Sequence, residues 1–213
     1  MLKDRVPNVL VAKYIGLGNF GLLSWAQKGR RTPLSFMDSI PRVTFPTFAR
    51  IQDNKEFLSK SIKKSIFFIA LFIFPSLAGI ALVAPNIINI IPKYTKWEPA
   101  LYPLYLYCLS FAIASITTPL TNAFNAVGKI TITTCLMIMW TSLTWIFFPL
   151  LSIKFNYIGT AYAALIVSSS SFVVWIIAKK LFNFNMILAI INPLIASILM
   201  IIIIIPISNL ISN

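Results

Sequence analysis

The sequence contains no histidine among its 213 residues. It has only five acidic residues, which are Asp4, Asp38, Asp53, Glu56 and Glu98. Histidine is the commonest general base and metal ligand near neutral pH, so its absence removes the usual catalytic and metal-binding chemistry. No two of the acids are spaced as a catalytic or metal-binding pair within one motif. We therefore expect no enzyme, no metal site and no cofactor.

Cysteine and nucleotide-binding motifs are equally scarce. The two cysteines, Cys108 and Cys135, both lie inside long apolar runs, which is typical of small buried hydrophobic side chains rather than of a disulfide or a metal pair. The sequence has no glycine-rich phosphate loop of the Walker type, which excludes ATP hydrolysis by that route.

Charged residues make up only 11% of the chain, whereas hydrophobic residues make up 58% and the mean hydropathy is +0.86. Soluble domains carry roughly a quarter charged residues. Five runs contain no Asp, Glu, Lys or Arg: 65–92, 99–128, 130–153, 155–178 and 181–213. Each run exceeds the roughly 20 residues that a helix needs to cross a bilayer. The composition therefore predicts a polytopic membrane protein whose main partner is the lipid bilayer.

The net charge of +13 would also suit a nucleic-acid-binding protein. Such proteins gather Lys and Arg on a solvated face, but here these residues lie at the ends of apolar runs, where they set membrane topology. We expect no nucleic-acid partner.

The apolar pattern predicts an all-α transmembrane bundle of about seven spans, which forms a single domain over residues 1–213. The connection 85–99 is predicted as a loop with a short interfacial piece. Short polar connections predict that successive helices run antiparallel. The expected helices are 6–27, 33–51, 62–84, 101–122, 130–152, 158–178 and 186–211.

Seven antiparallel spans divide the cationic residues of the connections into two sets of eight and six. The set that includes Arg50 to Lys64 is the larger, and the positive-inside rule assigns it to the cytoplasm. In this arrangement the basic connection around Lys28 and Arg31 lies outside, against the trend.

The segment 33–51 is unusual because it places Asp38 and Arg42 on one helix face inside a predicted span. Three readings stay open. The pair neutralises itself and holds helix packing, or it lines a polar path in which Arg42 attracts an anionic group, or one of the two lies at the membrane interface. Kinks are predicted at three prolines, which are Pro41, Pro46 and Pro75.

The stretch LGNFGLLSWAQKGRRTPLSFMDSIPRVTFPTFARIQDNKEFLSKSIKKS resembles the polysaccharide flippase family of the multidrug/oligosaccharidyl-lipid/polysaccharide exporter superfamily. The resemblance rests on the aromatic and alanine pattern of FGLLSWAQK, the helix end FPTFAR and the polar turn that follows. Later features, FPSLAGIALVAPNIINII, KYTKWEPA and NAVGK, also fit. It covers nearly all of this chain but about the C-terminal half of the family pattern. The resemblance therefore implies one bundle of a two-bundle transporter, with the N-terminal bundle missing.

The resemblance implies that a lipid-linked oligosaccharide is flipped across the bacterial cytoplasmic membrane for cell-surface polysaccharide synthesis. Basic residues would attract its pyrophosphate, and the expected partners are the missing half and polysaccharide assembly proteins. Two alternatives stay open, a drug or small-molecule antiporter of the same superfamily and a truncated membrane protein that transports nothing. The candidate substrate-binding residues, in order, are Arg42 with its neighbour Asp38, then Arg30 and Arg31, then Lys13.

Overall fold

The structure is a computed structural model that describes residues 16, 18–28, 31–183 and 185–212; for 31–39, 92, 188 and 205–212 it describes the backbone alone. The described chain is helical and contains no strand, which confirms the predicted all-α membrane bundle. After a helix of residues 18–28, the elements are α2 (Arg31–Arg50), α3 (Lys55–Ile90), the 3-10 helix η1 (Pro92–Ala100), α4 (Leu101–Ala126), α5 (Ile130–Ser169), α6 (Phe172–Phe182) and α7 (Ile187–Ser212).

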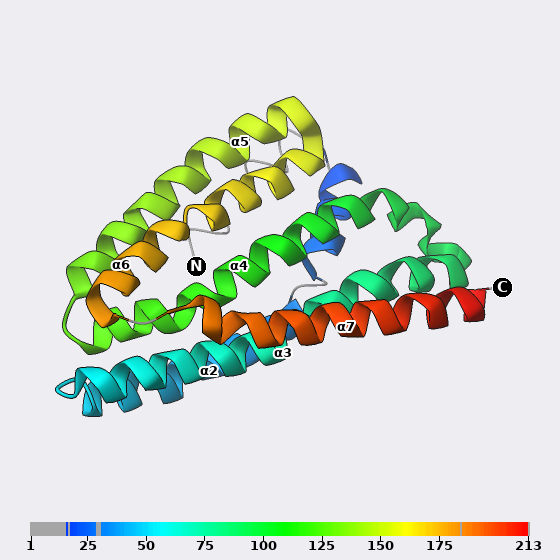
Figure 1. Cartoon of the computed structure of the whole chain (residues 1–213). Helices are drawn as coiled ribbons and strands as arrows, with labels where there is room; N and C mark the ends of the chain where they lie inside the picture. The colour runs from blue at the N-terminus through cyan, green and yellow to red at the C-terminus, as the bar shows by residue number, and fades with distance from the viewer. Residues whose placement is uncertain (1–15, 17, 29–30, 184, 213) are drawn as a thin grey trace.

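Three helical stretches in the described chain are long and apolar enough to cross a membrane: Lys55–Ile90, Lys93–Ala126 and Ile130–Phe182. The third doubles back on itself (Figure 1), because the helix is interrupted at Phe155 and Asn156. Asn156 has φ 52° and ψ −139°, in the positive-φ region that asparagine tolerates better than most residues. The predicted fifth and sixth helices are therefore the two limbs of one hairpin.

The prediction of a loop at 85–99 is wrong in its first part, because α3 continues through Pro85 to Ile90. Pro85 removes one backbone hydrogen bond, but the helix still satisfies the groups of the apolar residues that follow, which water cannot do inside a bilayer. The rest of the segment forms η1 rather than an open loop. At its start α3 is also longer than predicted, since the Asn54 Oδ1 accepts a hydrogen bond from the Phe57 amide at 3.0 Å and caps the helix.

The predicted kink prolines all lie inside helices, Pro41 and Pro46 in α2 and Pro75 in α3. The bends themselves stay predictions. The turn between α4 and α5 uses Gly128 at φ 75°, a conformation in which a side chain would be strained.

The helix of residues 18–28 and α2 run in the same direction along α4. The prediction that these two helices run antiparallel is therefore wrong. Trp25 stacks on Trp97 of η1 at 6.1 Å between ring centroids, and the Gln27 amide donates to the Tyr107 hydroxyl at 3.3 Å. Further along, the Asn122 amide donates to Thr44 Oγ1 at 3.2 Å. Contacts thus advance from η1 towards the end of α4 as residue number rises. Residues 18–50 therefore make one pass instead of two.

This course changes the charge balance between the two ends of the bundle. One end holds the connections between α2 and α3, α4 and α5, and α6 and α7, while the other holds η1 and the α5 reversal (Figure 1). We call the first the basic end; its cations are Arg50, Lys55, Lys60, Lys63, Lys64, Lys129, Lys179 and Lys180. The opposite end, the η1 end, has three: Lys93, Lys96 and Lys154. Among the described residues the bias is thus eight against three, where eight against six was predicted. Of the predicted six, Lys28 is at neither end, Arg31 begins α2, and Arg30 lies outside the described residues.

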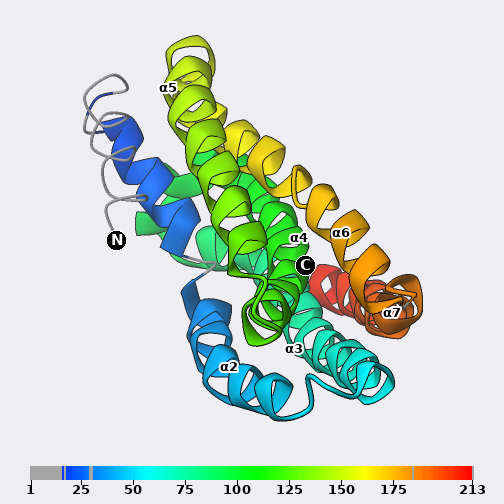
Figure 2. The ribbon, with the colours of Figure 1, turned by 90° about the vertical axis from the view of Figure 1, so that its left-hand side faces the viewer.

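The buried core consists of two clusters that follow one another along α3 and α4. The cluster nearer the η1 end includes Leu104, Tyr107 and Phe111, and the cluster nearer the basic end includes Ile62, Leu120 and Phe124. Viewed from one end of the bundle, α2 and α7 lie on opposite sides of α3 (Figure 2), and α4 packs against both α3 and α5.

The single pass of residues 18–50 predicts an accessibility pattern for introduced cysteines. In a variant without Cys108 and Cys135, a membrane-impermeant maleimide should label Gly18→Cys and Lys96→Cys from one side, and Asp53→Cys from the other. Gly18 suits this test because an added Cβ meets no atom within 4 Å. Labelling of Gly18→Cys from the side of Asp53→Cys, or from neither side, would contradict the single pass.

The α5 hairpin predicts that Gly159→Ala destabilises the protein. A Cβ at this position would overlap the backbone carbonyl of Leu151 on the opposite limb, so the limbs would have to separate. We expect a loss of about 1–3 kcal/mol, measured as a lower midpoint of thermal unfolding in detergent. The control is Gly79→Ala, whose Cβ would have Met200 Cε as its nearest neighbour at 3.9 Å. Equal midpoints for both variants would refute this account of the hairpin.

Candidate functional site

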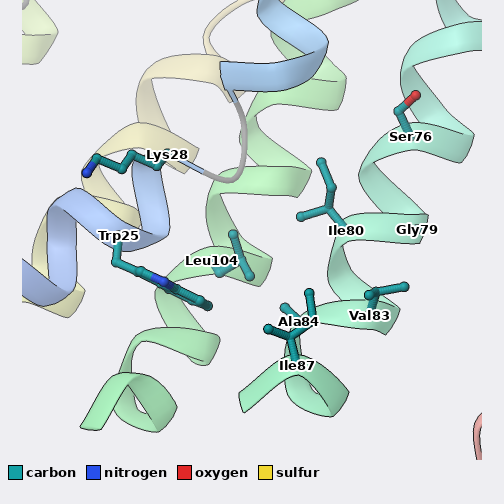
Figure 3. A pocket seen from close by; sticks show the side chains of 9 residues that line it. All are labelled: Trp25, Lys28, Ser76, Gly79, Ile80, Val83, Ala84, Ile87 and Leu104. Atoms are coloured by element: carbon teal, nitrogen blue, oxygen red, sulfur yellow. The ribbon is translucent and has the colours of Figure 1, made fainter. Parts of the chain in front are cut away.

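A cavity of about 570 Å³ lies between the helix of residues 18–28 and α3, with α4 behind it. Its walls are mostly aliphatic. Trp25 and Leu104 lie on one side and Ile80, Ala84 and Ile87 of α3 on the other (Figure 3). We call it the upper cavity.

One cation borders the upper cavity. Lys28 lies at its rim, and its amine extends away from α3 (Figure 3). Gln27, the preceding residue, contacts Tyr107, which lies six residues after Leu101 and therefore about 9 Å inside the η1 end of α4. Lys28 is thus placed at membrane depth, although its long side chain can extend towards the interface.

A second cavity of about 430 Å³, the lower cavity, lies between α2 and α3. Its wall on α2 is formed by Ile40, Val43 and Thr44. The α3 residues that line the two cavities fall on one helical face and follow one another along it, with spacings of three and four. They are Ser65, Phe68, Ile69, Phe72, Ile73, Ser76, Gly79, Ile80, Val83, Ala84 and Ile87. This face, the α3 stripe, is roughly 33 Å long and so matches the hydrocarbon thickness of a bilayer.

The wall opposite the α3 stripe is fixed to α4 at two levels. Near the η1 end, the buried Tyr107 hydroxyl donates to Thr160 Oγ1 at 2.9 Å and accepts from Gln27. Near the basic end, Thr44 accepts from Asn122 and donates to the Ile40 carbonyl at 2.9 Å. These polar contacts hold residues 18–50 beside α3 at the separation that leaves the two cavities.

Arg42 is the predicted site residue whose side chain the structure describes. It is exposed on α2, next to Val43 of the lower cavity, and has no ion-pair partner among the described residues. Because Thr44 contacts Asn122, four residues before the end of α4, Arg42 lies roughly 9 Å inside the basic end. Lys28 therefore lines the upper cavity, whereas Arg42 follows the lower-cavity wall in sequence without lining it, and the two cations lie at opposite depths.

The other predicted site residues are not tested by the structure. Asp38 and Arg31 lie in α2, but their side chains are outside the described part, so the predicted pairing of Asp38 with Arg42 stays a prediction. Lys13 and Arg30 lie outside the described residues altogether. Their roles, like that of Arg42, remain hypotheses.

Lys28 was not among the predicted site residues, because the sequence pattern placed it in a connection at a membrane surface. The sequence did contain a sign that Lys28 is unusual. With seven antiparallel spans, the connection around Lys28 lies on the side that the positive-inside rule disfavours. A basic connection on the disfavoured side indicates either a wrong orientation or a wrong span count.

A third cavity of about 450 Å³ lies between α4, α5 and α6 and is lined by hydroxyl side chains. Most of these hydroxyls donate to nearby backbone carbonyls, as Thr117 does to Ile113 and Thr144 does to Trp140. Such bonds are common in membrane helices and satisfy the hydroxyl hydrogen without a ligand. Among the described residues, no three His, Cys, Asp or Glu side chains come together as a metal-binding group.

The arrangement suits an amphiphile. An apolar stripe as long as the bilayer core can hold a hydrocarbon chain, and two exposed cations, Arg42 and Lys28, lie at two depths on the segments opposite it. The fold and this groove define the class of the protein as a polytopic α-helical membrane protein with an internal, lipid-compatible groove.

Comparison with known proteins shows what this chain is similar to. Residues 1–102 match the family described as polysaccharide biosynthesis protein. The lipopolysaccharide biosynthesis protein WzxC of Escherichia coli (strain K12) is 26% identical over 132 residues, which cover 62% of this chain and 27% of that protein. An uncharacterized membrane protein in the cps region of Klebsiella pneumoniae is 28% identical over 124 residues, which cover 58% of this chain and 24% of that protein. No solved structure matches the chain significantly.

These matches confirm the predicted resemblance to polysaccharide biosynthesis membrane proteins. The chain spans about a quarter of the length of the curated relatives that it matches. The matched residues 1–102 include the helix of residues 18–28, α2 and α3, which are the elements that build the groove.

The contacts of Tyr107 predict a measurable loss of stability in Tyr107→Phe. The substitution keeps the ring but leaves Thr160 and Gln27 without their shared hydroxyl, so we expect a loss of about 1–2 kcal/mol in the free energy of unfolding. Denaturant titration in detergent would measure it. Tyr105→Phe is the matched control, because Tyr105 lies on the same helix and is 39% exposed. A Tyr107→Phe variant as stable as Tyr105→Phe would show that the contact adds nothing.

Proposed function

We propose that this chain is part of a transporter that flips a lipid-linked polysaccharide precursor between the leaflets of a bacterial cytoplasmic membrane. The observation that carries the proposal is the pair of cations, Arg42 and Lys28, at opposite depths beside one apolar groove. The matches to known proteins also support a membrane protein related to polysaccharide biosynthesis. They favour a substrate from polysaccharide synthesis.

Orientation follows from the charge difference between the two ends of the bundle. The positive-inside rule places the basic end in the cytoplasm, and hence Arg42 in the cytoplasmic half of the membrane and Lys28 in the outer half. A lipid-linked glycan entering from the cytoplasmic leaflet would meet Arg42 first. Its lipid chain would lie along the α3 stripe, which accepts hydrocarbon at every depth.

The two cations then have distinct roles in the proposed cycle. The planar guanidinium of Arg42 donates two parallel hydrogen bonds to a phosphate oxygen pair and so favours capture. The ammonium of Lys28 is a point charge that stabilises the phosphate after it has moved roughly 20 Å along the bundle, which is about the rise of α4 between Tyr107 and Asn122. Two cations of similar strength keep the charged group from being trapped at either depth. The glycan itself would pass on the open side of α2, against the second bundle that the resemblance implies.

The proposal predicts that Arg42→Gln and Lys28→Gln each lower export of surface polysaccharide. A lost hydrogen bond to a charged group costs about 1.5–3 kcal/mol, or roughly tenfold or more in transport if that contact limits the rate. The measurement is the amount of cell-surface polysaccharide in a strain whose chromosomal gene carries the substitution, with membrane protein level determined by immunoblot.

The control is Lys154→Gln, which removes the same charge at the α5 reversal, away from the groove. It should leave export unchanged. Arg42→Lys separates the charge from the planar fork and should retain more export than Arg42→Gln. Normal export in both glutamine variants at normal protein level would remove the two cations from the transport path.

A further inference from the structure

A small basic hollow at the basic end of the bundle has no part in the proposed transport path. It lies between α3 and the first turn of α7, has a volume of about 290 Å³, and is lined by Lys60, Lys63, Lys64, Phe67 and Ala189. From it we infer a binding site for the phosphodiester headgroup of an anionic phospholipid. The inference does not depend on the proposed function.

The charge of the hollow is positive and largely uncompensated. Lys60 forms an ion pair with Glu56 at 2.7 Å, which is the only ion pair found among the described residues. Lys63 and Lys64 have no carboxylate partner in that part of the chain. The described side chains of α7 carry no charge, and the nearest acids in sequence are Asp53 and Glu56, before these lysines. Two cations therefore remain for an anion, and the positive end of the α7 dipole adds to them.

The level of the hollow in the membrane favours a lipid over a soluble anion. Residues 65–92 directly after Lys64 contain no charged residue, so these lysines mark the boundary between water and hydrocarbon. The Lys64 amine lies 6.0 Å from the ring centroid of Phe68, an aromatic side chain on the hydrocarbon side of that boundary. Phospholipid phosphates occupy the same boundary, and basic pockets between helices on the cytoplasmic side suit anionic headgroups.

The apolar surroundings suit the rest of such a lipid. Phe67 lines the hollow on its membrane side. The exposed residues Ile191, Leu194, Ile195 and Ile198 form a stripe on α7. Acyl chains can therefore continue from the headgroup along the surfaces of α3 and α7, which a free phosphate would not require.

The test is native mass spectrometry of the purified full-length protein in detergent with three lipids of equal acyl chains: phosphatidylglycerol, diphosphatidylglycerol and phosphatidylethanolamine. We expect the two anionic lipids to bind and the zwitterionic lipid to bind much more weakly. Equal binding of phosphatidylethanolamine would overturn the inference. Displacement of bound lipid by inorganic phosphate would identify a simple anion site and would also overturn it.

Substitution of lysines inside and outside the hollow tests whether the lipid binds there. Lys63→Gln with Lys64→Gln should weaken anionic lipid binding roughly 25-fold, because each lysine contributes about fivefold. The matched control, Lys179→Gln with Lys180→Gln, removes the same charge at the same end but outside the hollow, and should bind normally. An equal loss in the control would mean a diffuse surface charge and no site.

A charge-preserving variant guards against misfolding or a changed topology. Lys63→Arg with Lys64→Arg keeps both charges and should bind anionic lipid within about twofold of the unchanged protein. If the double glutamine variant does not fold, Lys64→Gln alone should show the roughly fivefold loss. Normal binding by a folded Lys64→Gln variant would contradict the assignment of Lys64 to the site.

Discussion

The contact among Gln27, Tyr107 and Thr160 is the interaction on which the arrangement of this bundle most depends. It joins the N-terminal segment, α4 and the returning limb of the α5 hairpin near one membrane surface. A buried hydroxyl in hydrocarbon must be satisfied within the protein, so the three segments cannot shift along one another without breaking it. Together with the stack of Trp25 on Trp97, it determines the course of residues 18–50. The groove exists because this course keeps the segment beside α3 without closing against it.

That course also resolves a conflict in the charge pattern. Seven alternating spans would place a cluster of cations on the outer surface, where topology disfavours them. Because residues 18–50 make one pass, Lys28 lies at membrane depth rather than in an outer connection. The cations of the remaining connections then lie mainly at the basic end, as the positive-inside rule expects. A charge that disagrees with the positive-inside rule was here a sign of an exposed cation at membrane depth rather than of a reversed orientation.

The sequence predicted most of the fold because hydrocarbon allows few alternatives to a helix. The helix 101–122 corresponds to α4 within four residues at its end, and the hairpin limbs were found as two separate helices. Two errors had a common origin in local rules. Pro85 followed by asparagines suggested a loop, yet α3 satisfies its backbone through this segment. The first two helices were assigned opposite directions because their connection is short, whereas their directions are set by distant partners, Trp97 and Asn122.

The candidate site, like the fold, could be predicted from the sequence only in part. Arg42 could be identified from sequence because a cation within an apolar segment is rare, and the structure leaves it exposed beside the lower cavity. The α3 stripe could not be identified, because an apolar residue that faces a cavity has the same sequence signature as one that faces lipid or the core. Only the separation of α2 and the helix of residues 18–28 from α3 distinguishes these cases.

The reversal in α5 has a consequence for biosynthesis. Only Phe155 and Asn156 leave the helical conformation, so the connection between the two limbs exposes few unpaired backbone groups. Its one nearby charge is Lys154, which a growing chain would have to carry across the bilayer. Because only two non-helical residues separate the two apolar limbs, the limbs are expected to enter the membrane together as a helical hairpin. Asn156 would then act during synthesis, by folding the pair before insertion, as well as in the finished protein.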